Sequence, residues 1–73
     1  MLFDFNKLRG RIVEKYGSYV LFADAAGISK ATLSGKLSNK VRITSEEMVA
    51  WSSPKMLDIP PAEIPLYFLS PKV

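Results

Sequence analysis

Two groups of neighbouring side chains in this sequence have the chemistry of enzyme sites. Ser29 and Ser34 lie close to lysines, as a serine nucleophile lies beside a lysine base, and Glu46 and Glu47 are adjacent carboxylates. A serine needs a positioned base, but the sequence has no histidine, and nothing in it indicates a buried lysine of low pKa or an oxyanion hole. The two glutamates fit the start of a helix, where negative charge complements the helix dipole, better than a magnesium site. We therefore predict no catalytic residues.

The composition removes other kinds of site. Without cysteine there is no disulfide, thiolate nucleophile or thiolate metal ligand, and without histidine there is no imidazole ligand. We expect no cofactor, no metal and no small-molecule substrate, and we expect that the protein is not an enzyme. Asp4 lies where a signal peptide would be apolar, and the apolar run at 66–69 is too short to span a bilayer. The sequence therefore predicts a cytoplasmic protein with no membrane partner.

The basic side chains are concentrated in the first half of the chain. The net charge is +3, but residues 1–42 hold eight basic and three acidic side chains, whereas residues 43–73 hold two and four. This asymmetry fits an anionic partner, either DNA or an acidic protein face, as well as an ordinary solvated surface. With 73 residues, of which 48% are hydrophobic and 23% charged, we expect one small globular domain over residues 1–73.

The first predicted helix follows Asp4, its N-cap candidate, and ends at Gly17. Its apolar residues recur at the spacing of one buried stripe, and its basic residues are left for solvent. The stripe consists of Phe5, Leu8, Ile12, Val13 and Tyr16, and the basic residues are Lys7, Arg9, Arg11 and Lys15.

Three further helices are predicted from their capping residues. Ser18 and Ser29 are N-cap candidates for helices over 19–26 and 30–37. A capping box, T-x-x-E at 44–47, begins a fourth helix, which the Ser-Ser-Pro sequence at 52–54 should break. The C-terminal tail, about residues 59–73, is rich in proline and aromatic residues and is expected to pack on the core. These elements predict an all-α fold, a compact domain of four to five helices.

The second and third predicted helices resemble a helix-turn-helix over about residues 18–37. In that motif two helices meet at about 90–120° across a short turn. The motif needs a small residue at the closest approach, a glycine in the turn, and apolar residues just after the turn and midway along the second helix. Those positions are occupied by Ala23, Gly27, Ile28 and Leu33. Lys36 departs from the motif, because many examples have an apolar residue there, and Leu37 follows it.

The whole sequence resembles the small Cro-like helix-turn-helix regulators of temperate phages that infect Gram-positive bacteria. Four segments carry the resemblance: FDFNKLRGRI at 3–12, AGIS at 26–29, KLSNK at 36–40 and EIPLYF at 63–68. Within this group the chain is most similar to the modulator-of-repression antirepressors of lactococcal-type phages. The resemblance implies a lambda-repressor-like fold and a place in the lysis–lysogeny switch of a bacterial host cell. Such proteins bind either operator DNA or the larger repressor beside which they act.

Direct DNA binding is one function of such a motif. The recognition helix presents its first turns to base edges, and basic residues after it meet phosphates. The candidate DNA-binding residues are Ser29, Lys30, Thr32, Ser34, Lys36, Lys40 and Arg42. This set offers few specific base contacts, because Arg, Asn and Gln make the commonest bidentate ones and none of them lies between residues 29 and 38.

The front of the helix at 19–26 favours a different partner. Tyr19, Val20 and Leu21 stand where related sequences carry polar residues that meet the phosphate backbone. Three consecutive helical residues fan over roughly 200°, so that with Phe22 inward at least one or two of them should be exposed. Exposed apolar and aromatic groups mark protein interfaces. The alternatives are that the C-terminal tail covers this patch or that the Tyr19 hydroxyl contacts a phosphate.

We therefore favour an antirepressor that binds the N-terminal DNA-binding domain of the cognate repressor, with direct operator binding as the alternative. The candidate partner-binding residues are Tyr19, Val20, Leu21, Asp24, Lys30, Ala31 and Ser34. In this hypothesis the apolar helix front supplies the affinity, Lys30 and Lys36 meet carboxylates, and Asp24 meets a basic residue that the repressor uses for DNA. Operator DNA is then excluded by competition.

Overall fold

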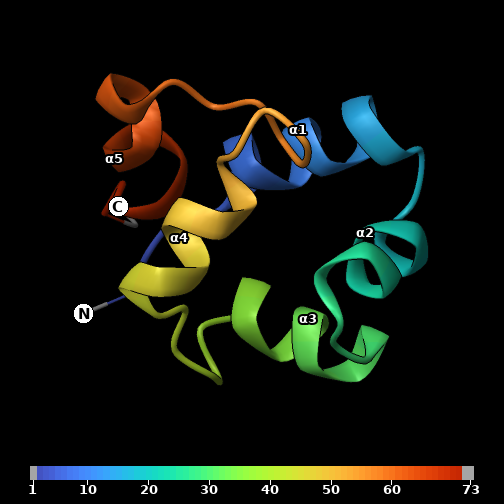
Figure 1. Cartoon of the computed structure of the whole chain (residues 1–73). Coiled ribbons are helices and arrows are strands. Elements are labelled where there is room, and N and C mark those ends of the chain that lie inside the picture. Colours follow the sequence, from blue (N-terminus) through green and yellow to red (C-terminus); the bar gives the residue numbers. More distant parts are fainter. Residues whose placement is uncertain (1, 72–73) are drawn as a thin grey trace.

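The computed structural model describes residues 2–71 and is all-α over that range (Figure 1). The helices are α1 (Asn6–Tyr16), α2 (Tyr19–Ala26), α3 (Lys30–Leu37), α4 (Ser45–Trp51), a short 3-10 helix η1 (Pro61–Glu63) and α5 (Ile64–Phe68). The β-type pairing between residues 2 and 71 is limited to an isolated antiparallel bridge between Phe3 and Pro71. Among these helices none is long and apolar enough to cross a membrane.

The bounds of α2 and α3 agree with the sequence prediction because local capping groups set them. The Ser18 hydroxyl accepts a hydrogen bond from the Leu21 N–H (3.3 Å), and the Ser29 hydroxyl accepts one from the Thr32 N–H (3.0 Å). Each bond satisfies a donor that the first helical turn leaves without a partner. Gly27 ends α2 at φ +75°, a left-handed conformation that glycine adopts without a Cβ clash.

The predicted capping box begins α4. The Thr44 hydroxyl accepts from the Glu47 N–H (3.1 Å), and the Glu47 carboxylate accepts from the Thr44 N–H (2.9 Å). The helix ends at Trp51, and Ser52 closes it by donating from its hydroxyl to the Met48 carbonyl (2.6 Å). The break before Pro54 is therefore confirmed.

The N-terminus of α1 differs from the prediction. Phe5, not Asp4, occupies the N-cap position, and the helix has no side-chain cap. The Asp4 carboxylate instead accepts from the Asn6 N–H (2.9 Å). Val13 is 48% exposed, so its place in the buried stripe was wrong.

A single group of apolar side chains forms the core, and aromatic rings from four elements meet in it. The Trp51 ring lies edge-on to Phe22 at 5.1 Å between centroids, Tyr16 also lies edge-on to Phe22 at 5.2 Å, and Phe68 lies 6.3 Å from Trp51. Such edge-to-face pairs add to the stabilisation from apolar burial. The buried apolar residues are Phe5, Leu8, Ile12, Phe22, Ala23, Leu33, Leu37, Ile43, Trp51, Leu57, Ile59, Tyr67 and Phe68.

The described part of the C-terminal tail packs on the core as expected; Lys72 and Val73 lie outside the described residues. Ile59, Tyr67 and Phe68 are buried, and α5 packs against α1. The Asp4 N–H donates to the Ser70 carbonyl (2.8 Å), which holds the two ends of the chain side by side. In Figure 1 α5 lies on the opposite side of the molecule from α2 and α3, so the tail leaves those two helices uncovered.

Candidate functional site

The front of α2 is an exposed apolar surface. Val20 is 52% exposed and Leu21 57% exposed, while Tyr19 is half-buried against the core. Phe22 and Ala23 occupy the opposite side of the helix and are buried. The expectation that at least one of the first three residues faces solvent is therefore confirmed, and the alternative that the tail covers the patch is wrong.

The other residues predicted to contact a partner are also exposed. Asp24 lies three positions after Leu21 and four after Val20, a spacing that places the three on one helix face. On α3, Ser34 lies three positions after Ala31 and four after Lys30, so these exposed residues also share one helix face. We call these residues together the α2–α3 surface: Tyr19, Val20, Leu21, Asp24, Lys30, Ala31 and Ser34.

The turn at 27–29 fixes α3 against α2. The Gly27 N–H donates to the Asp24 carbonyl (3.1 Å), and the Ile28 N–H donates to the Ala23 carbonyl (3.0 Å). The Ile28 side chain packs against the core, as does buried Leu33 in the middle of α3. Because both sides of the turn are anchored, the two helices are held as adjacent elements (Figure 1).

Two hydroxyls of the candidate DNA-binding set are engaged with each other. The Ser29 hydroxyl donates its proton to Thr32 Oγ1 (2.9 Å) while it accepts from the Thr32 N–H. It therefore has no proton left to donate to a base in this conformation. Ser34, one turn further along α3, is exposed.

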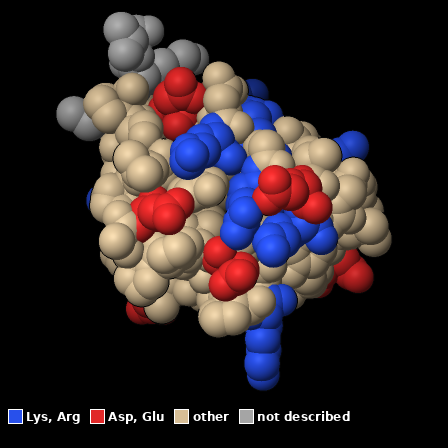
Figure 2. Space-filling view, turned by 90° about the horizontal axis from the view of Figure 1, so that it is seen from above, with Lys and Arg blue, Asp and Glu red and all other residues tan. Residues whose placement is uncertain are grey.

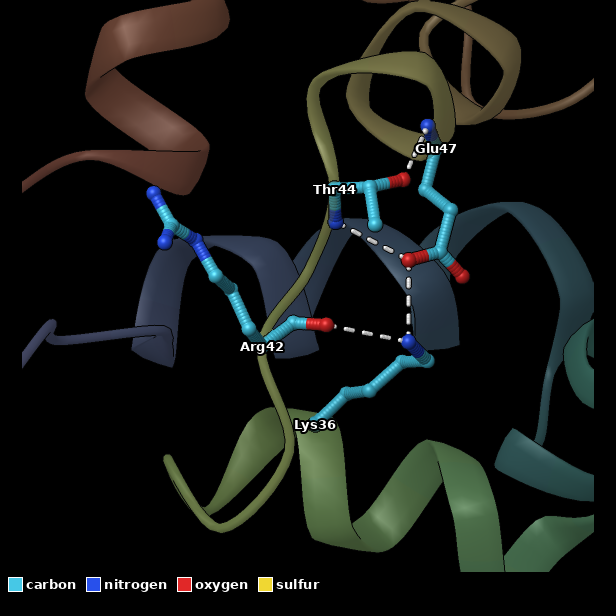
Figure 3. A network of polar contacts seen from close by, with 4 residues as sticks. All are labelled: Lys36, Arg42, Thr44 and Glu47. Carbon is cyan, nitrogen blue, oxygen red and sulfur yellow. Dashed lines mark hydrogen bonds and ion pairs between the residues drawn. The ribbon is translucent and has the colours of Figure 1, made fainter.

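Lys36 does not lie on the surface, which corrects its prediction as a phosphate or carboxylate contact. Only 7% of the residue is exposed, and its ammonium donates to Glu47 Oε1 (2.9 Å) and to the Arg42 carbonyl (3.1 Å) (Figure 3). A buried ammonium requires such partners, because an unpaired one is costly to remove from water. Its place at a normally apolar position of the motif was the sequence signal that its side chain points inward.

The sequence predicted Glu47 only as part of the α4 cap. The structure shows that it also pairs with Lys36. Burial raises the pKa of the Glu47 carboxyl, but the contacts with the Thr44 N–H and the Lys36 ammonium together lower it by more, so the net pKa lies below the ordinary value. The carboxylate is therefore ionised at neutral pH and balances the charge of Lys36. Across residues 2–71 no group of three or more His, Cys, Asp or Glu side chains comes together as metal ligands do.

Two basic side chains of α1 also hold the fold together rather than remaining in solvent. The Arg9 guanidinium donates to the Leu37 carbonyl (2.9 Å). The Arg11 guanidinium donates to the Leu57 and Asp58 carbonyls (2.8 and 2.7 Å) and pairs with Glu14 at 2.7 Å. The basic first half of the sequence is thus only partly a basic surface, and the face in Figure 2 shows blue side chains interspersed with red ones.

Lys30, Lys40 and Arg42 remain as exposed cations of the candidate DNA-binding set. In Figure 3 the guanidinium of Arg42 points away from the Lys36–Glu47 pair, although its carbonyl accepts from Lys36. The exposed cations are therefore separated along the chain, with Lys30 at the start of α3 and the other two in the α3–α4 loop.

Comparison with known proteins relates the chain to a sequence family and to a solved structure. The sequence model of a family described as "Protein of unknown function (DUF739)" matches residues 1–71. The solution structure of the modulator of repression of the temperate bacteriophage TP901-1 from Lactococcus lactis is similar over 100% of this chain and 96% of its own, at 38% identity and a TM-score of 0.80. A search of curated proteins finds no match.

Proposed function

The chain belongs to the family described as Protein of unknown function (DUF739), and from its similarity to a phage modulator of repression we propose that it regulates a lysis–lysogeny switch. It acts as an antirepressor in the cytoplasm of the bacterial host. It binds the N-terminal DNA-binding domain of the cognate repressor and prevents that domain from occupying its operator. The role is one of binding without catalysis.

In this proposal α2, the turn at 27–29 and α3 are a helix-turn-helix. Ala23 is buried where the two helices approach, Gly27 takes the left-handed turn conformation, and Leu33 is buried midway along α3. These are the features that the motif requires. The motif serves here as a rigid support for the α2–α3 surface.

The exposure of Val20 and Leu21 is the observation that carries the proposal. Both apolar side chains are more than half exposed beside half-buried Tyr19. Removing such groups from water favours association with another protein, whereas a phosphate backbone offers them no apolar partner. A standard interface of about 800 Å² per partner would cover roughly a sixth of the 4707 Å² accessible surface, an area that a domain of this size can offer.

Charges at the edge of the surface provide complementarity to a DNA-binding domain. A repressor domain presents basic side chains to operator phosphates. Asp24 is exposed on the same helix face as Leu21, and in this proposal it meets one of those cations. A cation that pairs with Asp24 is lost to the operator, so partner binding competes with DNA binding.

Direct operator binding in the manner of Cro remains the second candidate, because Lys30, Lys40 and Arg42 are exposed cations on α3 and the loop that follows it. Ser29, Thr32 and Ser34 complete that set. Two contacts weaken this candidate. Lys36 pairs with Glu47 and is not available to a phosphate, and the Ser29 hydroxyl is hydrogen-bonded to Thr32. It predicts binding to DNA in the absence of the repressor.

Replacement of Leu21 by Ala tests the proposed interface. Because Leu21 is exposed, Leu21→Ala should leave the thermal unfolding midpoint nearly unchanged while raising the Kd for the repressor's DNA-binding domain. An interface anchor contributes about 1–2 kcal/mol, which corresponds to a roughly five- to thirtyfold higher Kd. Val49→Ala is the matched control, since Val49 is 67% exposed on α4, outside the α2–α3 surface. Equal affinities for Leu21→Ala and Val49→Ala would exclude Leu21 as an anchor.

A further inference from the structure

An apolar hollow, separate from the α2–α3 surface, lies between the α3–α4 loop, the N-terminal segment and α5. It has a volume of about 760 Å³. Buried Phe5, Ile43 and Phe68 lie at its base, and the more accessible side chains of Phe3, Val41, Met48 and Leu69 also line it. We call this hollow the α3–α5 groove, and it shares no lining residue with the α2–α3 surface.

Hydrogen bonds hold the walls of the groove in place. The Asn39 side chain accepts from the Phe3 N–H (2.9 Å) and donates to the Phe3 carbonyl (3.0 Å), which joins the N-terminal segment to the loop. The Val41 N–H donates to the Gly35 carbonyl (3.2 Å), and Val41 packs so closely there that a Cβ on residue 35 would lie 3.2 Å from its Cγ2. The Arg42 carbonyl is held by Lys36. A ligand would therefore meet a groove that is already formed.

The groove carries an unbalanced positive charge. Lys40 and Arg42 line it, and within residues 2–71 neither side chain forms a hydrogen bond or an ion pair. The charge of the third cation, Lys36, is balanced by Glu47. None of the described residues that line the groove is acidic. An apolar base with two available cations is complementary to a molecule that has an apolar body and an anionic group.

We propose that the α3–α5 groove binds a small apolar anion, with an aromatic or aliphatic body and one carboxylate or sulfonate group. The body packs on Phe3, Val41 and Met48, and the anionic group pairs with Lys40 and Arg42. The volume lies within the range of roughly 300–1,000 Å³ that is usual for small-molecule sites. The ligand is bound and not transformed, so this site goes beyond the antirepressor function and does not depend on it.

A matched pair of fluorescent dyes tests the proposal on the full chain. One probe is 8-anilinonaphthalene-1-sulfonate, which combines an apolar aromatic body with an anion, and the other is N-phenyl-1-naphthylamine, which has the same body without the sulfonate. Both fluoresce more strongly in an apolar site. We expect the sulfonate to bind about tenfold more tightly, because a charge-assisted contact is available to it alone. Equal affinities for the two dyes would overturn the proposed recognition of an anion.

Variants locate the site. The double variant Lys40→Gln/Arg42→Gln should weaken sulfonate binding about tenfold and leave the neutral dye unchanged, while Lys15→Gln, an exposed lysine of α1, should change neither. Val41→Ser should weaken the binding of both dyes, and Val49→Ser the binding of neither.

Backbone amide shifts in an NMR titration with the sulfonate should centre on Phe3, Val41 and Leu69. Shifts centred on α2 instead, or a double variant that binds the sulfonate like the natural chain, would overturn the assignment.

Discussion

One carboxylate oxygen, Oε1 of Glu47, accepts hydrogen bonds from the Thr44 N–H and from the Lys36 ammonium, both at 2.9 Å. It therefore begins α4 and at the same time neutralises a lysine that α3 turns inward (Figure 3). Loss of this group would leave a nearly buried ammonium with one neutral partner, the Arg42 carbonyl. Removing only one partner of such an ion pair is costly, because the other charge stays buried without a counter-charge.

Replacement of Glu47 by Gln should lower the free energy of unfolding by about 1–3 kcal/mol at pH 7, because Lys36 loses its counter-charge. The pKa of the Glu47 carboxyl is lower in the folded than in the unfolded chain, so its stabilisation is present above the unfolded pKa and is lost as pH falls through the folded pKa. The natural chain should therefore lose stability as pH falls below about 5, and Glu47→Gln should lose less over the same interval. Urea unfolding at a series of pH values measures both effects.

Glu46→Gln is the matched control, because Glu46 is exposed in the same helical turn and has no contact with Lys36. It should keep the pH dependence of the natural chain. If Glu46→Gln and Glu47→Gln gave the same pH dependence, the pairing of Glu47 with Lys36 would not contribute to stability.

At the scale of the elements, helix boundaries followed from the sequence wherever the capping groups are local. Ser18, Ser29 and the Thr44–Glu47 box each act within three residues, and α2 and α3 have the predicted bounds. Contacts between distant parts of the chain were not predictable in this way. Arg9 meets a carbonyl 28 residues away, and Arg11 meets one 46 residues away. No local pattern encodes those partners, so both arginines had been assigned to solvent.

Part of the candidate site was also predictable from the sequence, and part was not. Helical geometry predicted that at least one or two of Tyr19, Val20 and Leu21 are exposed, and the structure shows that they are Val20 and Leu21. The burial of Lys36 was not predicted, since its partner Glu47 lies 11 residues away on the next helix. The position of the C-terminal tail also depends on packing between α5 and α1, which local spacing does not specify.

Gly10 lies inside α1 with open space around it, since a Cβ built there meets no heavy atom within 4 Å. Gly10→Ala should raise the free energy of unfolding by about 1 kcal/mol, because alanine loses less backbone entropy on forming a helix. Gly27→Ala should lower it by about 1–2 kcal/mol, because φ is +75° at that position. Urea unfolding distinguishes the two, and a destabilised Gly10→Ala variant would show that α1 has a close neighbour at that site.

At the scale of the whole molecule, the chain measures 29 × 26 × 21 Å and presents different surfaces on different sides. α2 and α3 form one side, and α5 packs on α1 at the other (Figure 1). The apolar front of α2 and the cations of the α3–α4 loop are thus carried by separate elements. Binding a protein through the first and an anion through the second does not require a rearrangement of the core.

The dependence of binding on salt should distinguish the two candidate functions. If Lys30, Lys40 and Arg42 neutralised three phosphates, the logarithm of the DNA association constant would fall with log salt at a slope of about −2.7, or roughly 40-fold between 50 and 200 mM. An interface centred on Val20 and Leu21 should weaken less than about fivefold over that range, because apolar burial is not screened. Titrations at four salt concentrations, one series with an operator duplex and one with the repressor domain, measure the two dependences. A steep slope would contradict an apolar interface.

The most direct test of the central claim is isothermal titration of this protein into the isolated N-terminal DNA-binding domain of the cognate repressor at about 150 mM salt. The antirepressor function predicts a submicromolar Kd and a complex that no longer binds an operator duplex. An absence of heat at several temperatures, together with binding of the protein alone to that duplex, would contradict the antirepressor function and establish direct operator binding.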